Sequence, residues 1–232
     1  MEHDSSRSGY HQLQPESAGH NVHNFADDAD MEWDSDDIEA STHQLKPYVN
    51  LIWAQGFAPD GTPGAIGKDG SMLWRLSEDM KYFKDRTITH PVIMGRKTWE
   101  SLSEQYRPLS NRDNYVISRN PNFTAAGATV MDSLEDAIEL ASQPTIPDDG
   151  VRRDEVWIIG GAQIYNAALP FTDAIYITDV DIHIDADTFV PDMSREIAAG
   201  RWSEEIIQDW TTPRNSTNDI SRFRFRVLRR VQ

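Results

Sequence analysis

Short apolar runs that alternate with helical segments constrain the fold of this chain more than any other feature. We predict helices over residues 77–85, 97–102, 133–141 and 163–169. The apolar runs between and around them predict strands over residues 49–54, 91–94, 114–118, 128–130, 155–159, 174–180 and 222–228. Such alternation is typical of an α/β fold with a mixed, mainly parallel central sheet, helices on both faces and an antiparallel C-terminal edge.

Residues 1–46 differ in composition from the rest of the chain. They hold eleven acidic and two basic residues, a net charge of −9, and residues 47–232 carry the remaining −7 of the total −16. The few apolar residues of this segment follow no helical or strand period, so their burial could not offset the entropy lost on ordering. We therefore predict a disordered acidic extension over 1–46 and a folded domain over 47–232.

Several classes of function receive no support from composition. No run near the N-terminus has the length of a signal peptide and no stretch could span a membrane, so we expect a cytoplasmic protein without a membrane partner. The chain has no cysteine, and its histidines lack the spacing of a metal site. Arg222, Arg224 and Arg226 alternate with apolar residues, which predicts a half-buried strand with its charged face in water rather than a nucleic-acid surface. We expect a monomer.

One carboxylate falls on the apolar side of a predicted helix. Ser77 is a good N-cap, which places Asp79 in the first turn, with Met80 beside it and Phe83 one turn further along the same face. A carboxyl group among these side chains and Trp74 needs a donor from the protein or a ligand, because burial without one costs several kcal/mol. The alternative is a capping carboxylate turned to solvent.

Two strand ends are candidates for an anion site. At the first, Gly95-Arg96-Lys97-Thr98 turns from strand to helix and aims backbone N–H groups and two cations at one point, which favours phosphate. It is not a P-loop, because Arg96 separates Gly95 from Lys97 and His90 occupies the place of the earlier glycine. The next strand ends at Ser118 and Arg119, which could complete the site.

A third strand runs into two adjacent glycines, Gly160 and Gly161, followed by the helical residues Ala162-Gln163-Ile164-Tyr165. Backbone without side chains at a helix start allows a flat or phosphorylated group to approach closely. The pair does not match the Gly-x-Gly-x-x-Gly pattern of dinucleotide-binding folds. Taken alone, adjacent glycines at a strand end are more often a simple turn.

Together these segments resemble dihydrofolate reductase of the bacterial chromosomal type over roughly residues 48–231. The resemblance implies a sheet of about eight strands flanked by four helices. It also implies NADPH-dependent reduction of 7,8-dihydrofolate to 5,6,7,8-tetrahydrofolate, which supplies one-carbon metabolism. Six motifs in the family's order carry it: Val49-Asn50-Leu51-Ile52-Trp53-Ala54, Ile66-Gly67, Trp74 with Asp79, Pro91-Val92-Ile93-Met94-Gly95-Arg96-Lys97-Thr98-Trp99-Glu100-Ser101, Ile158-Ile159-Gly160-Gly161 with Tyr165, and Tyr176-Ile177-Thr178.

The resemblance assigns catalytic and substrate-binding roles. Asp79 would accept hydrogen bonds from the 2-amino group and N3 of the pterin, while Thr178 bonds the carboxylate or its water. A water admitted by the loop near Met72 and ordered by Trp74 would protonate N5, since a carboxylate that binds the other ring atoms does not readily reach it. Apolar walls and an arginine for the glutamate tail would complete the substrate site: Ile52, Ala54, Met80, Phe83, Leu102, Ile159 and Arg112.

The cofactor implied by the resemblance is NADPH. The cations at the two strand ends exceed what a pyrophosphate needs, which favours NADPH over NADH because the 2′-phosphate is the extra anion to be recognised. The implied contacts are Ala54, Ile66, Gly67, Gly95, Arg96, Lys97, Thr98, Ser118, Arg119, Ile159, Gly160, Gly161, Ala162, Gln163, Ile164 and Tyr165.

The chain departs from the family pattern locally. Residues 58–64 lengthen the segment before Ile66-Gly67, Leu73 stands where proline is common, and Trp53 stands where a small residue is frequent. Two alternatives stay open. One is a pyrimidine reductase of riboflavin synthesis with the same fold, against which the Trp74 and Asp79 pair argues. The other is a catalytically silent binding module whose acidic extension captures a basic partner, against which the intact site argues.

Overall fold

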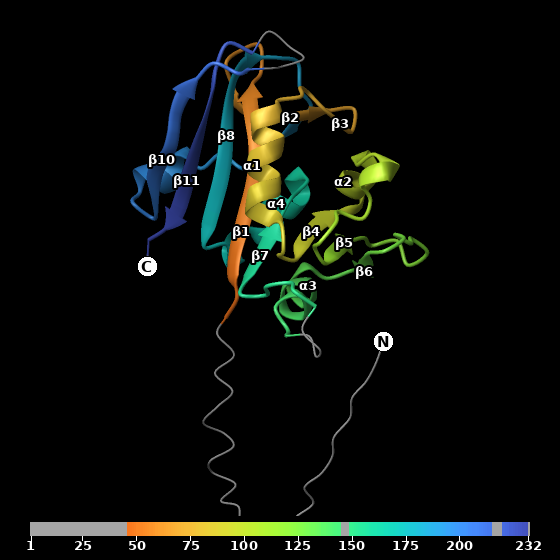
Figure 1. Ribbon diagram of the computed structural model, residues 1–232. Coiled ribbons are helices and arrows are strands. Elements are labelled where there is room, and N and C mark those ends of the chain that lie inside the picture. Colours follow the sequence, from red (N-terminus) through yellow and green to blue (C-terminus); the bar gives the residue numbers. More distant parts are fainter. Residues whose placement is uncertain (1–45, 145–148, 215–219, 232) are drawn as a thin grey trace, which may run out of the picture. The chain divides into compact units, whose positions relative to one another are not determined.

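The computed structural model describes residues 46–144, 149–214 and 220–231, which form a mixed sheet with helices on both faces (Figure 1). Eight of the strands in this part of the chain lie side by side in the order β10-β11-β8-β1-β7-β4-β5-β6. Their bounds are β1 Tyr48–Phe57, β4 Val92–Gly95, β5 Asn114–Ile117, β6 Thr129–Met131, β7 Glu155–Ile158, β8 Ala174–His183, β10 Trp202–Thr211 and β11 Phe223–Arg230.

The interior of the sheet is parallel and one edge is antiparallel. β1 pairs in parallel with β7 and β8, and β4, β5 and β6 continue the parallel part. β11 runs antiparallel to β8, and β10 antiparallel to β11. Three short strands branch off beside β1: β2 (Pro63–Lys68), β3 (Ser71–Met72) and β9 (Thr188–Phe189). The predicted mixed, mainly parallel sheet of about eight strands with an antiparallel C-terminal edge is confirmed.

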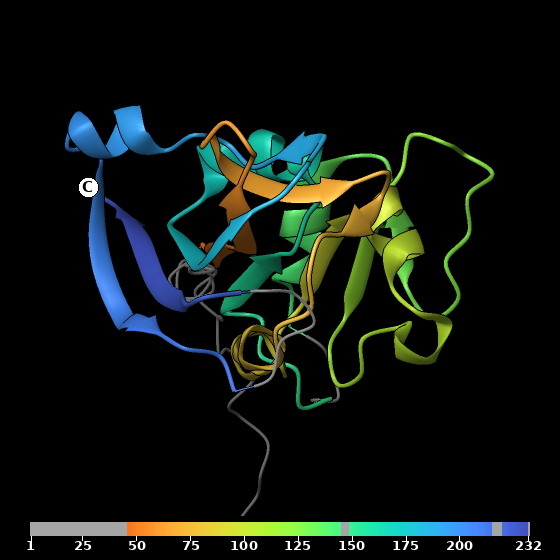
Figure 2. The same cartoon turned by 90° about the horizontal axis from the view of Figure 1, so that it is seen from above.

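Helices cover both faces of the sheet, as Figure 2 shows along a perpendicular view. On one face, α1 (Ser77–Thr87) and α2 (Arg96–Ser101) pack through Phe83 and Trp99 against one apolar cluster. On the other, α3 (Leu134–Ala141) and α4 (Ala162–Ala168) pack through Leu134 and Tyr165 against a second cluster. A fifth short helix, α5 (Ser194–Ala198), precedes β10. No helix of the described ranges is long and apolar enough to cross a membrane.

Two local predictions are wrong. Ser77 is not the N-cap of α1, since it is the first helical residue, the N-cap is Leu76, and no side chain caps the helix. The arginine face of β11 is not in water, because the side chains of Arg224 and Arg226 are only 27% and 12% exposed and both pair with Asp179. Strand alternation shows which residues share a face, but it does not show what a neighbouring strand places against that face.

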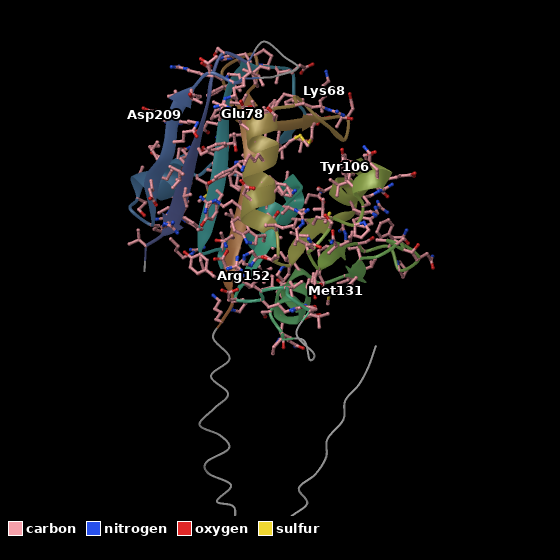
Figure 3. The ribbon with its side chains drawn as sticks, in the orientation of Figure 1. Lys68, Glu78, Tyr106, Met131, Arg152 and Asp209 are labelled. Atoms are coloured by element: carbon pink, nitrogen blue, oxygen red, sulfur yellow. The ribbon has the colours of Figure 1, made fainter. Side chains whose placement is uncertain are left out.

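The pattern of the chain also does not predict β10. Nearly all of its residues are exposed, so the strand has no apolar alternation to reveal it. The parallel strands matter most for function, because their carboxyl ends gather at one edge of the sheet, where ligands bind in open α/β folds. Glu78, at the start of α1, and Lys68, the last residue of β2, lie at that end, and Arg152 lies at the opposite end (Figure 3).

Candidate active site

Asp79 on α1 and Thr178 on β8 form the polar centre of the candidate site. The Thr178 hydroxyl donates a hydrogen bond of 2.6 Å to Oδ1 of Asp79 across the face of the sheet. Thr178 is fully buried and Asp79 is half-buried. Burial raises the pKa of the Asp79 carboxyl to about 6, and the Thr178 hydrogen bond opposes that rise by stabilising the charged form. The Asp79 carboxylate therefore receives a hydrogen bond from one neutral donor and can accept further hydrogen bonds.

Among the buried side-chain atoms of the described residues that have no hydrogen-bond partner, two belong to residues within five positions of Asp79 in the sequence. They are the indole N–H of Trp74, a residue only 4% exposed, and the hydroxyl of Tyr82. Burial also raises the pKa of the Tyr82 hydroxyl. Tyr82 was not among the predicted site residues, although its position one turn after Asp79 on α1 is a signal that could have found it. Met72 in β3, by contrast, is 67% exposed.

Apolar side chains line the sheet face beside Asp79. Ile52 on β1 and Ile159 after β7 are buried in one cluster, and Phe83 and Leu102 pack against it. Ala54 is half-buried and packs against the neighbouring cluster around Trp74. Four of the predicted wall residues thus share one cluster, whereas Ala54 packs against the next, and Met80 is 57% exposed and belongs to neither.

Arg112 lies at the C-terminal end of α1. Its Nη1 donates to the hydroxyl of Thr87 at 2.8 Å and its Nε donates to the Ser110 carbonyl at 3.1 Å. The guanidinium carbon lies 5.9 Å from the centre of the Phe83 ring. Burial lowers the pKa of this guanidinium. Its remaining N–H groups find no partner in the described part of the chain, so they can take a carboxylate from a ligand.

The glycines at the ends of β4 and β7 meet directly. The Gly95 N–H donates to the Gly160 carbonyl at 2.7 Å, and the peptide bond between Gly160 and Gly161 is cis. A Cβ at Gly95 would lie 3.0 Å from Cγ1 of Ile164, and Gly160 has a φ of +112° that side chains rarely adopt. The chain therefore has room for backbone alone at this corner.

Thr98 and Tyr165 enclose the same corner. A Cβ at Gly161 would lie 3.3 Å from Oγ1 of Thr98 on α2, and one at Gly160 would lie 3.0 Å from the Tyr165 hydroxyl on α4. That hydroxyl donates to the Ile52 carbonyl at 2.7 Å, so it ties α4 to β1. Ala162 and Gln163, in the first turn of α4, are half-buried and exposed.

The predicted cations lie on adjacent strand ends. Gly95 of β4 is opposite Ile117 of β5, so Arg96 and Ser118 follow at the same edge. The Nε of Arg96 lies 3.9 Å from Oε1 of Glu100 in a half-exposed pair. The side chains of Lys97 and Arg119 make no hydrogen bond or ion pair within the described ranges, and both residues are exposed. Ser118 is buried and its hydroxyl accepts from the Asn120 N–H at 3.2 Å.

Ile66 and Gly67 belong to β2, outside the main path of the sheet. Ile66 packs against the cluster that contains Tyr165. The Gly67 carbonyl accepts from the Asp187 N–H at 3.1 Å, and Oδ2 of Asp187 accepts from the Asp69 N–H at 2.9 Å. These bonds fasten the β2–β3 turn to the segment before β9.

A family model of dihydrofolate reductase matches residues 48–230, which include every predicted site residue. This chain belongs to the dihydrofolate reductase family. It is 46% identical over 147 residues to the dihydrofolate reductase of Mycobacterium leprae, which covers 62% of this chain and 80% of that protein. It is 43% identical over 130 residues to the enzyme of Neisseria gonorrhoeae, which covers 56% of this chain and 74% of that protein.

A solved structure supports the same family. The dihydrofolate reductase from Enterococcus faecalis, complexed with NADP(H) and RAB-propyl, superposes with a TM-score of 0.64 at 27% sequence identity. The match covers 81% of this chain and 98% of that one. The recognition of dihydrofolate reductase from sequence motifs is therefore confirmed, and the pairing of Asp79 with Thr178 lies within the matched region.

Proposed function

We propose that this chain reduces 7,8-dihydrofolate to 5,6,7,8-tetrahydrofolate with NADPH, and that Asp79 is the residue on which substrate recognition depends. The observation that carries the proposal is the Asp79 carboxylate, whose one side-chain hydrogen bond within the described ranges comes from a neutral hydroxyl. With a pKa of about 6, the carboxyl group is largely ionised at pH 7. A pterin offers two adjacent N–H donors, at the 2-amino group and N3, and these would supply the donors that the charged form lacks.

Reduction of the C=N bond places a hydride on carbon and a proton on the adjacent nitrogen. NADPH, when bound, supplies the hydride, so the protein has to orient the pterin and deliver the proton. We assign proton delivery at N5 to a water admitted beside the exposed Met72. The indole N–H of Trp74, buried without an acceptor among the described residues, is a donor that would hold this water in place.

The remaining substrate contacts follow from shape and charge. Ile52, Phe83 and Ile159, together with Leu102 and Ala54, would pack on the ring system and its linker and exclude water. Arg112 would bind the α-carboxylate of the glutamate tail with its free guanidinium edge, since a planar fork matches a planar anion. Exposed Met80 would close on the ligand from α1.

The cations beside the glycine corner fit NADPH by an observation independent of family. The side chains of Lys97 and Arg119 are exposed and have no anionic partner in the described part of the chain, so they are available to the phosphates of the cofactor. Cβ atoms at Gly95, Gly160 or Gly161 would crowd Ile164, Tyr165 or Thr98, so only glycine fits at the corner against which the nicotinamide-ribose would lie. Arg96, Lys97, Thr98, Ser118 and Arg119 would bind the phosphates, with Ile66, Gly67, Ala162 and Gln163 flanking the nicotinamide end.

The first test is oxidation of NADPH by the purified full-length chain with dihydrofolate present and absent. We expect oxidation that depends on dihydrofolate and tetrahydrofolate as the product. Turnover of a ribosylated pyrimidine in its place would favour the pyrimidine reductase, and cofactor binding without turnover would favour a silent relative. We also propose that the chain acts as a cytoplasmic monomer and that its catalytic domain begins near residue 47.

A further inference from the structure

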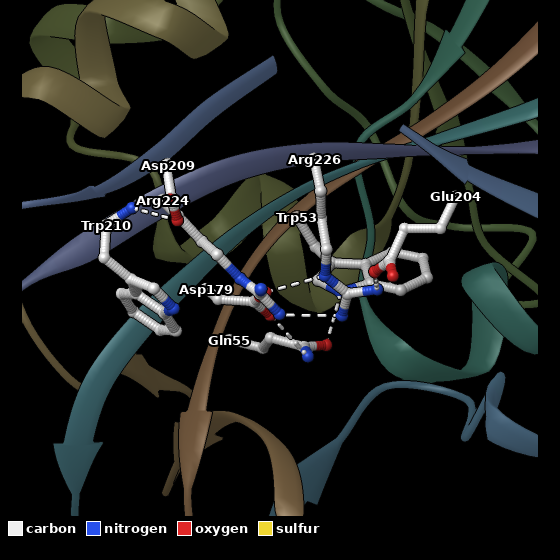
Figure 4. Close-up of polar contacts among 8 residues, drawn as sticks. All are labelled: Trp53, Gln55, Asp179, Glu204, Asp209, Trp210, Arg224 and Arg226. Atoms are coloured by element: carbon white, nitrogen blue, oxygen red, sulfur yellow. Dashed lines mark hydrogen bonds and ion pairs between the residues drawn. The ribbon is translucent and has the colours of Figure 1, made fainter. Parts of the chain in front are cut away.

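A charged cluster lies on the face of the sheet opposite Asp79. We call it the rear cluster and define it as Gln55, Asp179, Arg224 and Arg226 (Figure 4). Asp179 accepts from Nε of Arg226 at 2.6 Å, from Nη2 of Arg226 at 3.1 Å and from Nε of Arg224 at 2.8 Å. Its Oδ1 also accepts from Nε2 of Gln55 at 3.0 Å. The carboxylate side chain is only 7% exposed.

Burying these charges is not an efficient way to stabilise a sheet. Removing two cations and a carboxylate from water costs several kcal/mol per ion, and apolar residues of similar size often stabilise as well. Each nitrogen of the Arg226 guanidinium nevertheless donates to a carboxylate, since its Nη1 also donates to Oε1 of Glu204 at 3.0 Å. Such a buried ionic cluster is better explained by structural specificity than by stability, because its bonds form in only one arrangement of the strands that carry these residues.

The cluster joins β1 to β8 at the last regular step of their ladder. Gln55 is directly opposite Asp179, and the preceding rung pairs Ala54 with Thr178. Between Gln55 and Phe57 the register shifts. The regular ladder therefore continues on only one side of the Gln55–Asp179 pair. On the other side, where the register shifts, the side-chain hydrogen bond from Gln55 to Asp179 links the two strands. Thr178, one residue away, holds Asp79.

Packing behind this rung is incomplete. A cavity with a volume of about 220 Å³ borders Gln55, Trp53 and Arg226 on the rear face, and Met193 and Ile197 also line it. The Trp53 ring packs beside Tyr165 in the apolar cluster, and its Nε1 donates a hydrogen bond of 2.8 Å to Oε1 of Gln55. Polar contacts thus add to packing where the cavity borders Gln55.

We propose that Gln55 and Asp179 are positioning residues, which fix the Ala54–Thr178 rung from the rear face and so hold the Thr178 hydroxyl in line with the Asp79 carboxylate. For its catalytic consequence this inference rests on the proposed reduction of dihydrofolate. The geometric part stands apart from it, because the bond between Thr178 and Asp79 joins two side chains of the protein itself.

The test replaces Gln55 with Met, a side chain of similar size that cannot form the two hydrogen bonds, and leaves the arginine pairs of Asp179 intact. Glu204→Gln is the matched control, because it changes an outer contact of the same cluster and leaves the rung unchanged. Since Thr178 lowers the pKa of Asp79, a displaced hydroxyl should move the apparent pKa of hydride transfer upward. We expect that rise in Gln55→Met, with a loss in kcat/KM for dihydrofolate of roughly threefold to tenfold.

The titrating group can be identified from its surroundings. The other ionisable side chains that interact electrostatically with Asp79 are Tyr82 on α1 and Tyr165 on α4, and burial raises the pKa of both. Both therefore stay neutral near pH 7, so a change in the acidic limb reports on Asp79. Thr178→Val provides the benchmark. If Gln55 acts through Thr178, the double variant Gln55→Met/Thr178→Val should have the same apparent pKa as Thr178→Val alone.

Each outcome decides the proposal. A Gln55→Met protein with a lower Tm but an unchanged pH profile would make the rear cluster merely structural and overturn the inference, as would equal effects of Glu204→Gln. If Gln55→Met does not fold, the milder Gln55→Asn takes its place with the same expectation. Carbon-13 NMR titration of Asp79 in the ligand-free protein needs no turnover. A shift there in a chain that fails to reduce dihydrofolate would reject the proposed function and keep the positioning role.

Discussion

Asp79 and Asp179 are two carboxylates, the first half-buried and the second buried, that lie on opposite faces of one sheet and are connected through strand β8. Thr178, which bonds Asp79, and Asp179 are neighbours on β8, and successive side chains of a strand point to opposite faces. Asp79 has one neutral donor, whereas Asp179 has two guanidinium groups and an amide. The first carboxylate can therefore accept bonds from a ligand, and the second is fully used by the protein.

The difference shows that one carboxylate is left available for a ligand while the other fixes the geometry of the sheet. A charge that is incompletely paired in the folded protein destabilises it and gains its partners when a ligand arrives. A charge with a complete set of partners gives a fixed geometry but has nothing left for a ligand. Aspartate can therefore bind a ligand or fix the structure, and the number of hydrogen-bond donors around it decides between these two roles.

The largest effect should come from Asp179→Asn. This change keeps the shape of the side chain but leaves Arg224 and Arg226 buried without their shared anion. Removing one partner from such a group destabilises a protein by about 3–5 kcal/mol, a large part of the total stability of a domain. Urea denaturation at pH 7, with an unchanged m-value, measures it. A loss below about 1 kcal/mol would show that Asp179 is not the centre of the cluster.

The same substitution at Asp79 should act on activity instead. Asp79→Asn removes the charge and presents a donor where the pterin needs an acceptor, so we expect kcat/KM for dihydrofolate to fall at least about a hundredfold. Stability should move in the opposite direction to that of Asp179→Asn. Near-normal turnover at neutral pH would contradict the assignment of Asp79.

The pH dependence of that stability gain follows from the raised pKa. The Asp79 carboxyl has a pKa of about 6 in the fold against an ordinary value of 3.8, so the folded protein holds its proton more tightly than the unfolded chain does. Its favourable contribution is complete below about pH 4 and is lost as pH rises through 6. Asp79→Asn should therefore stabilise by about 1–3 kcal/mol at pH 7 and by almost nothing at pH 4. An equal gain at both pH values would mean that charge is not its cause.

The same contrast, between charged groups bonded within the protein and charged groups left for a ligand, extends to the arginines. Arg226 is fully bonded, but Arg119 is exposed and pairs with nothing in the described part of the chain. If Arg119 binds the 2′-phosphate, Arg119→Ala should weaken NADPH by about 1.5–3 kcal/mol and leave NADH nearly unchanged. The ratio of the two dissociation constants, measured at low and moderate salt, is the informative quantity. Arg96→Ala is the comparison, because its corner could also contact the pyrophosphate. Equal weakening of both cofactors by Arg119→Ala would remove half the basis for NADPH preference.

The contrast also shows what a sequence can reveal. Helical spacing predicts α1 and the face that carries Asp79, because both depend on neighbours within two turns. The bond from Thr178 crosses 99 positions of sequence, and only the family resemblance brings the two residues together before the structure is known. The α/β class and the antiparallel edge follow from local patterns, which are repeated along the whole domain.

The rear cluster could not be predicted in the same way. Alternation at Arg224 and Arg226 gives a strand with a polar face, but the carboxylate that pairs with them lies on β8, 45 and 47 positions away. Gln55 meets it across 124 positions. On an isolated strand those arginines would be exposed to water. They become buried because β11 lies between β10 and β8 in the sheet. Strand β10, exposed along nearly its whole length, has no local signal either.

The smallest effect should follow removal of residues 1–44, because both carboxylates and all their partners lie within the described ranges after them. The segment has few apolar residues to bury, and its negative charge is screened beyond about 8 Å at physiological salt. We expect kcat, the apparent pKa of hydride transfer and the thermal midpoint to stay within error of the full-length chain. The truncated protein should also reproduce the opposite stability changes of Asp79→Asn and Asp179→Asn. Loss of folding on truncation would make the acidic segment part of the domain, and a shifted pKa alone would mean that its charge acts on Asp79.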